Sequence, residues 1–187
     1  MDKIERIRQL KKLIKQRILV VDGAMGTSIQ NLNLTGKDFG GLDYEGCNEN
    51  LNITKPEAIE SIHRNFLEAG ADIIETNSFG STPLVLDEYD LGKEAFKISQ
   101  ASAKIAREVA DKFSTKEKPR FVAGSMGPTT KAISVTGGVT WDDLAEHYRI
   151  QVAGLIDGGV DLLLLETSQD ILNVKAGLEG IDRAFAE

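Results

Sequence analysis

Four repeats of a short apolar strand followed by a helix restrict the fold of this chain more than any other feature of its sequence. Each strand-like run is mostly apolar, and the runs cover residues 18–22, 71–76, 120–124 and 161–166. Apolar residues at helical spacing follow each run, directly or after a loop. Buried strands that alternate with helices are typical of a parallel sheet covered by helices. We therefore expect an α/β fold with about four parallel βα units.

The expected helices are marked by apolar residues three or four positions apart. They cover residues 4–14, 54–69, 96–113 and 141–157, and a fifth begins after Ser168. Thr54 with Glu57 forms a capping box, and Thr140 and Ser168 are expected N-caps. Residues 23–52 are rich in Gly, Asn and Asp, and the length of this stretch predicts a functional loop.

An internal repeat favours a barrel over an open sheet. Residues 68–76 resemble residues 157–167, because each has a helix end, a Gly turn, a strand and a Glu-Thr exit. A complete (β/α)8 barrel needs eight such units and typically ~250 residues. We therefore expect a partial (β/α)8 TIM barrel in one incomplete domain, residues 1–187. An N-terminal helix lies within residues 1–16, and the first half of the barrel covers residues 17–187.

The charge balance excludes two classes of partner. The chain has 22 basic and 29 acidic residues and a net charge of −7, so it lacks the basic surface that binds nucleic acid or an anionic membrane. Residues 1–16 are charged throughout and form neither a signal peptide nor a membrane span. Because Cys47 is the only cysteine, no intrachain disulfide can form. We expect a cytoplasmic protein.

Candidate binding residues follow the strands, because ligand sites of parallel α/β folds lie at the carboxyl ends of the strands. These segments are Asp22–Thr27, Thr76–Gly80, Ser125–Thr129 and Glu166–Thr167. Gly23 and Gly26 let backbone N–H groups approach a carboxylate or phosphate, although a tight turn also uses glycine. Asp22 and Glu166 place carboxylates beside an apolar interior, where each needs a cation. That cation is either a substrate ammonium or a neighbouring Lys or Arg, and the residues alone leave both alternatives open.

Other chemically versatile residues are expected to be structural. His63 and His147 fall inside helices, with no second ligand at metal-binding spacing. Cys47 has no CxxC partner and is expected to be a packed or free thiol. Asp72 and Asp161 begin strands, at the end of a barrel that serves stability.

Five motifs together resemble one family. They are Asp22–Thr27, Gly46–Leu51, Glu68–Gly80, Val122–Thr129 and Glu166–Ala176. Their order and spacing are similar to those of the homocysteine S-methyltransferase barrel, and within that family to the N-terminal module of the cobalamin-dependent methionine synthases. The resemblance covers residues 17–187, and five motifs in order are far more specific than any one of them.

The resemblance implies that the chain binds homocysteine. In the family, a zinc ion held by three cysteines converts the substrate thiol into a thiolate. The thiolate takes a methyl group from methylcobalamin. That methyl group comes from 5-methyltetrahydrofolate. The metal is needed because a free thiol, with a pKa near ~8.5, is mostly protonated at neutral pH.

The resemblance also implies the substrate-binding residues. The substrate ammonium is expected at Asp22, Gly23, Ala24 and Glu166, and the substrate carboxylate at backbone donors near Thr76, Asn77 and Ser125.

One departure from the family pattern is as informative as the match. The zinc cysteines of the family lie in the second half of the barrel, in an Asn-Cys motif and a Gly-Gly-Cys-Cys-Gly motif that this sequence lacks. Cys47 does not replace them. We expect no zinc or cobalamin on this chain, no catalytic residue in it and no turnover by it alone. Its expected partners are homocysteine, the missing C-terminal half of the barrel, and downstream folate- and cobalamin-binding modules.

Two other functions remain open. Relatives with the same barrel take the methyl group from betaine or S-methylmethionine, although the Gly46–Leu51 and Thr76–Gly80 motifs favour the cobalamin enzymes. Alternatively, the chain is a noncatalytic half-barrel, which acts as an interaction protein and dimerises through its exposed sheet edges.

Overall fold

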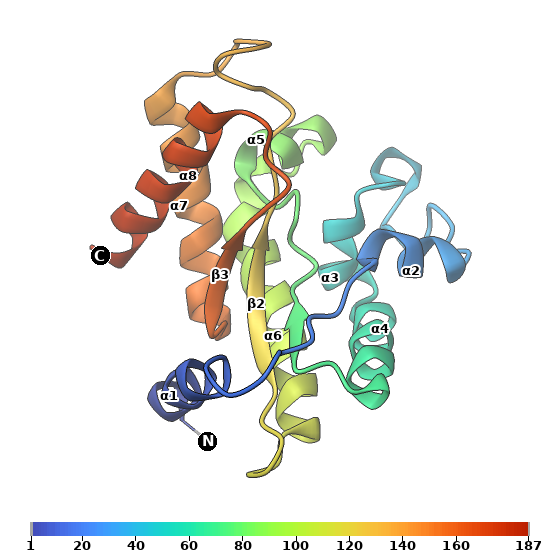
Figure 1. Ribbon diagram of the computed structural model, residues 1–187. Coiled ribbons are helices and arrows are strands. Elements are labelled where there is room, and N and C mark those ends of the chain that lie inside the picture. Colours follow the sequence, from blue (N-terminus) through green and yellow to red (C-terminus); the bar gives the residue numbers. More distant parts are fainter. Residues whose placement is uncertain (1, 187) are drawn as a thin grey trace.

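The computed structural model, which describes residues 2–186, has a three-stranded parallel sheet with its longest helices packed on one face (Figure 1). The strands are β1 (Ile73–Glu75), β2 (Phe121–Met126) and β3 (Leu162–Leu165), and they lie in the order β1-β2-β3. Both pairs are parallel. The expected α/β class is therefore confirmed.

The helices alternate with the strands as expected. They are α1 (Lys3–Leu13), α2 (Met25–Asn31), α3 (Leu51–Thr54), α4 (Pro56–Ala69), α5 (Pro83–Leu86), α6 (Ala95–Phe113), α7 (Trp141–Gly158) and α8 (Ile171–Phe185). Short 3-10 turns are η1 (Leu42–Tyr44), η2 (Asn48–Asn50), η3 (Asp87–Tyr89) and η4 (Gly92–Glu94). The stretch expected as one loop over residues 23–52 thus contains α2, η1, η2 and the start of α3.

Side chains alternate between the two faces of the sheet, as strand geometry requires. On the helix-covered face, Ile74, Val122 and Met126 join an apolar core with α6 and α7. Helix α7 approaches α6 closely, because a Cβ on Gly154 would lie 2.4 Å from the carbonyl oxygen of Phe96. This packing fixes the positions of the strands, and so of the strand ends.

The second face of the sheet is the one that a closed barrel turns inward. Ile73, Phe121 and Ala123 form a smaller apolar cluster here, packed against Leu10 and Leu13 of α1. Helix α1 therefore covers the lower part of this face, beside the amino ends of the strands (Figure 1).

Residues 18–22 differ from the expected strand buried on both faces. Val21 forms only an isolated parallel bridge with Ile73, and the side chain of Ile18 is 88% exposed. The physical reason is the position of this segment at the edge of the sheet, where β1 is its only paired neighbour in the described structure. Residues 2–186 therefore form three strands and a bridge in place of four full strands.

Two of the three expected helix caps are wrong. Thr54 closes α3, and its hydroxyl donates to the carbonyl of Asn50, so it does not cap α4. Ser168 lies before the start of α8, whose N-cap is Asp170. Thr140 is the N-cap of α7 as expected, since its side chain accepts from the backbone N–H of Asp143. Caps depend on where the chain turns, which local sequence alone does not fix.

Ion pairs to two buried aspartates fasten the amino ends of the strands. Asp161, at the start of β3, accepts from Arg6 of α1 and from Arg107 of α6, each at 2.7 Å. Asp72, at the start of β1, pairs with Arg17 at 2.7 Å. The expected structural role of both aspartates agrees with these contacts.

Among residues 2–186, no helix has the length and apolar character needed to cross a bilayer.

Candidate substrate site

A cavity of about 250 Å³ lies at the carboxyl ends of the three strands. Its walls come from the exits of β1, β2 and β3, from the start of α2 and from η2. The lining residues are Met25, Gly26, Asn48, Glu49, Glu75, Thr76, Asn77, Phe79, Ser125 and Glu166. Four of the seven predicted site residues, Thr76, Asn77, Ser125 and Glu166, are therefore brought together.

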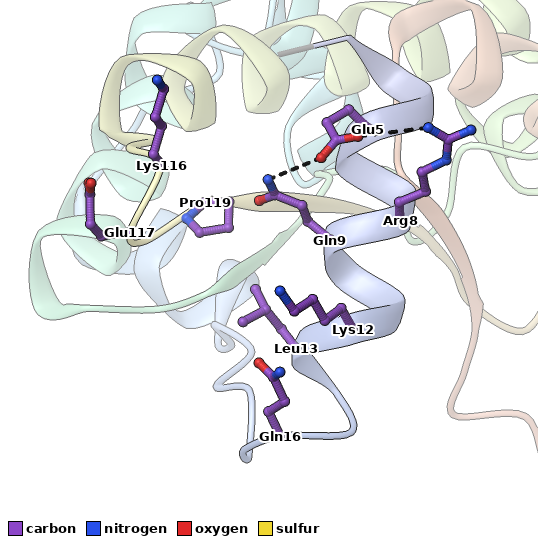
Figure 2. A pocket seen from close by; sticks show the side chains of 9 residues that line it. All are labelled: Glu5, Arg8, Gln9, Lys12, Leu13, Gln16, Lys116, Glu117 and Pro119. Atoms are coloured by element: carbon purple, nitrogen blue, oxygen red, sulfur yellow. Dashed lines mark hydrogen bonds and ion pairs between the residues drawn. The ribbon is translucent and has the colours of Figure 1, made fainter.

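A second cavity, of about 270 Å³, lies at the opposite end of the sheet, between α1 and residues 116–119 (Figure 2). Charged side chains of both signs line it, and Glu5 already pairs with Arg8 and with Gln9. The strand-end cavity is the better candidate for a ligand site, because ligands of parallel α/β folds bind at the carboxyl ends of the strands.

The remaining predicted residues lie beside the strand-end cavity. Asp22 Oδ1 accepts a hydrogen bond from the backbone N–H of Glu75 at 2.8 Å, which holds Asp22 against the exit of β1. Ala24 is the N-cap of α2 and has a left-handed backbone with φ of 50°. The next two residues line the cavity, whereas Gly23 and Ala24 themselves do not. The turn needs its left-handed residue at Ala24, since Gly23 has no positive φ.

Asp22 lies near the acidic lining residues Glu75 and Glu166. Burial, and to a smaller extent the charges of Glu75 and Glu166, raise the pKa of Asp22 to about 7. Burial, and then the charge of Glu166, also raises the pKa of Glu75. No Lys, Arg or His lines the cavity within the described residues, and neither Asp22 nor Glu166 forms an ion pair with residues 2–186. No described Lys, Arg or His therefore pairs with Asp22 or Glu166, and the negative charge at this end of the sheet favours a cation.

Hydrogen bonds within the protein make the wall between β1 and β2 rigid. Ser125 N donates to Thr76 Oγ1 at 3.0 Å, and the Ser78 hydroxyl donates to the carbonyl of Ser125 at 2.8 Å. Buried Gln151 of α7 donates to the carbonyl of Ser78 at 2.7 Å. Ser125 Oγ in turn donates to Glu166 Oε1 at 2.7 Å. Ser125 therefore orients a carboxylate with its hydroxyl, while its backbone N–H is already engaged.

The segment 48–52 holds the loop that follows β1. Asn77 Nδ2 donates to the carbonyl of Asn48 at 2.8 Å, and Asn52 Nδ2 donates to the carbonyl of Asn77 at 2.7 Å. Glu49 Oε1 accepts from the backbone N–H of Gly80 at 2.7 Å. These contacts fix the shape of the loop and leave Glu49 in the cavity wall.

Six lining residues were not among the predicted site residues: Met25, Gly26, Asn48, Glu49, Glu75 and Phe79. Glu75 was detectable as the last polar residue of its strand, and Glu49 lies inside the Gly46–Leu51 motif. Phe79 lies in the candidate segment Thr76–Gly80, but its apolar side chain was not singled out. Its ring lies against Gly127, where a Cβ would come within 2.6 Å of a ring carbon, so only glycine allows this contact.

The residues of this chain do not fit a zinc site. Cys47 packs against Leu86, Ala95 and Ile98, and burial raises the pKa of its thiol to about 11. His63 is fully buried inside α4, and burial lowers the pKa of its ring to about 4. Within residues 2–186, no three His, Cys, Asp or Glu side chains are arranged to hold a metal ion. The expectation of a packed thiol is confirmed.

Residues 19–186 match the homocysteine S-methyltransferase family, and the chain belongs to that family. The resemblance of the five motifs is thereby confirmed.

Two methionine synthases are similar to this chain in sequence. The protein of Mycobacterium leprae (strain TN) is 44% identical over 178 residues, and that of Mycobacterium tuberculosis (strain ATCC 25618 / H37Rv) is 45% identical over 176 residues. The alignments cover 95% and 94% of this chain but only 14% of each relative. The chain thus spans a small part of the length of these relatives.

Solved structures of the homocysteine methyltransferase MmuM from Escherichia coli share the fold. The metallated form superposes with a TM-score of 0.75 at 23% identity, over 95% of this chain and 63% of MmuM. The oxidized form gives 0.75 at 24% identity, over 95% and 62%. The expected partial-barrel fold is confirmed by this likeness.

Proposed function

We propose that this chain is the homocysteine-binding part of a methionine synthase. In such an enzyme the homocysteine sulfur accepts a methyl group from methylcobalamin, and 5-methyltetrahydrofolate supplies that methyl group to the cobalamin. Identity of 44% and 45% to two methionine synthases supports this methyl donor over betaine or S-methylmethionine. Folate- and cobalamin-binding modules are then parts of a longer protein, of which this chain corresponds to about one seventh.

One observation carries the substrate assignment: the carboxylates of Glu75 and Glu166 line a small cavity that has no basic side chain among its described lining residues, and Asp22 lies beside them. Charges of one sign, partly removed from water, favour a ligand cation. In this proposal the ammonium of homocysteine lies at Asp22, Gly23, Ala24 and Glu166, as expected from the family motifs. The substrate carboxylate lies toward Thr76, Asn77 and Ser125.

The chain's own residues bind and orient the substrate in this proposal. The Ser125 hydroxyl holds Glu166 toward the cavity, and the bonded loop after β1 keeps Asn77 in place. Binding before reaction lowers the entropic cost of bringing the thiol to the methyl donor. Because the described residues do not fit a zinc site, we assign no step of the reaction to a metal on this chain.

Isothermal titration calorimetry with reduced L-homocysteine tests the proposed site. We expect saturable binding to one site, and binding weaker by roughly tenfold or more for 4-mercaptobutanoate, which lacks only the ammonium. D-homocysteine is the matched control, because it carries the same charges with the wrong stereochemistry. Equal affinity for all three ligands, or no binding of L-homocysteine, contradicts the proposal.

A metal assay tests the second part of the proposal. We expect the purified chain to hold far less than one equivalent of zinc and to form no methionine from methylcobalamin and homocysteine. Zinc near one equivalent together with homocysteine-dependent methyl transfer contradicts this part, and leaves the substrate assignment to the calorimetry.

A further inference from the structure

The strand-end cavity offers few hydrogen-bond donors for a substrate carboxylate. The Asn77 amide donates to Asn48 and Asn52. The Ser125 N–H and hydroxyl donate to Thr76 and Glu166. Because no basic side chain lines the cavity within the described residues, a substrate carboxylate is bound there by uncharged hydrogen-bond donors, either backbone N–H groups or a protonated side chain.

Glu49 occupies an unusual position in this wall. Its Oε1 accepts from the backbone N–H of Gly80 at 2.7 Å, so that oxygen is engaged. No described residue donates to Oε2, although Glu49 lines the cavity. A carboxyl group that accepts through one oxygen and carries a proton on the other is a hydrogen-bond donor.

We propose that Glu49 is protonated and donates a hydrogen bond from Oε2 to the carboxylate of the amino-acid substrate, an inference that rests on the proposed homocysteine site. Glu49 is thus a further substrate-binding residue, at the opposite chemical end of the substrate from the ammonium-binding carboxylates. An amino acid is selected over a simple aminothiol because only the amino acid supplies the acceptor for this proton.

The surroundings of Glu49 favour the protonated form. Burial raises the pKa of Glu49, and no Lys, Arg or His pairs with it in the described structure. The titratable groups that interact with it electrostatically are the Cys47 thiol and the Tyr89 hydroxyl, both neutral at pH 7 because their pKa values are raised. Glu75 and Glu166 share the cavity with it, and their negative charges add no stabilisation to an ionised Glu49. A protonated carboxyl beside a carboxylate in a partly dry site also matches general electrostatics.

Three variants and two ligands test the assignment by calorimetry. The ligands are L-homocysteine and 3-aminopropane-1-thiol, which is homocysteine without its carboxylate. Glu49→Gln keeps an acceptor for the Gly80 N–H and a donor toward the cavity, Glu49→Ala removes both, and Glu45→Gln changes an exposed glutamate nearby as a control.

The expected result is a selective loss. Glu49→Ala weakens the binding of L-homocysteine by roughly tenfold or more, but its affinity for 3-aminopropane-1-thiol stays within about twofold of that of the unaltered protein. Glu49→Gln and Glu45→Gln bind both ligands as the unaltered protein does. As the pH rises and Glu49 ionises, the preference of the unaltered protein for homocysteine over 3-aminopropane-1-thiol falls, whereas the preference of Glu49→Gln stays constant.

Two results overturn the assignment in distinguishable ways. If Glu49→Ala weakens both ligands equally, or Glu49→Gln is as defective as Glu49→Ala, Glu49 only supports the loop or acts as an ionised group. The proposed homocysteine site then stands without this contact. If the unaltered protein binds neither ligand, the proposed function itself is wrong.

Discussion

The two ends of the sheet use acidic side chains in opposite ways. At the amino ends, Asp72 and Asp161 each pair with arginine at 2.7 Å. At the carboxyl ends, Asp22, Glu75 and Glu166 lie near one another without a described cation. Hydrogen bonding to Arg17 lowers the pKa of Asp72, whereas burial raises those of Asp22 and Glu75.

This difference separates stability from binding in one small sheet. An acidic residue that has its cation inside the protein stabilises the fold and is unavailable to a ligand. An acidic residue that is buried without one costs stability and retains its affinity for a ligand cation. Removing the charge should therefore destabilise the protein at the amino ends and stabilise it, or leave it unchanged, at the carboxyl ends.

Asp161→Asn gives the largest expected effect. The change leaves the Arg6 and Arg107 guanidinium groups buried beside a neutral amide, and such broken buried pairs cost about 3–5 kcal/mol. Urea unfolding followed by circular dichroism measures the loss. The control is Asp111→Asn, which removes the partly exposed partner of Arg107. An equal loss of unfolding free energy in both variants would mean that the buried pairs of Asp161 stabilise the fold no more than the exposed pair of Asp111 does.

Glu166→Gln should weaken homocysteine binding without lowering the stability of the fold. The glutamine oxygen still accepts from the Ser125 hydroxyl, so we expect an unchanged or higher unfolding midpoint, while L-homocysteine binds roughly tenfold or more weakly because the ammonium loses a charge partner. Calorimetry and urea unfolding on the same sample measure both quantities. A variant that loses stability but retains its affinity would place Glu166 in the structural class of Asp161.

Asp22→Asn tests the sign of the pH dependence at the binding end. The folded-state pKa of Asp22, about 7, lies above its ordinary value of 3.8, so the folded protein binds the extra proton. The stabilisation that comes from this proton is fully present below pH 3.8, the ordinary pKa of Asp, and is lost as the pH rises through about 7. The asparagine variant, which keeps an acceptor for Glu75 N, should therefore be more stable than the unaltered protein at pH 8 by about 1–2 kcal/mol, after allowance for solvent screening. At pH 4 the two should agree; a constant difference across this range contradicts the raised pKa.

Arg17→Gln gives the smallest effect, with the opposite sign. Because the folded-state pKa of Asp72 is lowered, the ion pair stabilises the protein above the ordinary Asp value and loses that effect as the pH falls through the folded value. The variant should melt slightly lower than the unaltered protein at pH 7 and at the same temperature in strong acid. Thermal melts from pH 7 downward check this, and a difference that grows in acid excludes the assigned pair.

The sequence predicted the site to a considerable extent, because chain order decides which residues follow each strand. Thr76, Asn77, Ser125 and Glu166 were found from strand positions and family motifs, and all four line one cavity. Glu49 was missed as a site residue, because it comes from a turn far from any predicted strand end. Its place in the wall depends on the contact with Gly80, 31 residues later in the chain.

The pattern of apolar runs determined by itself that the strands are parallel and that helices separate them, since a parallel crossover requires a long connection. It also determined which carboxylates end a strand and which begin one. Only the tertiary structure decided which of these carboxylates meet an arginine, how far residues 18–22 join the sheet, and which hydrogen-bond donors remain free in the cavity. Pairing partners and burial come from contacts between distant segments, and local sequence carries no direct record of those distances.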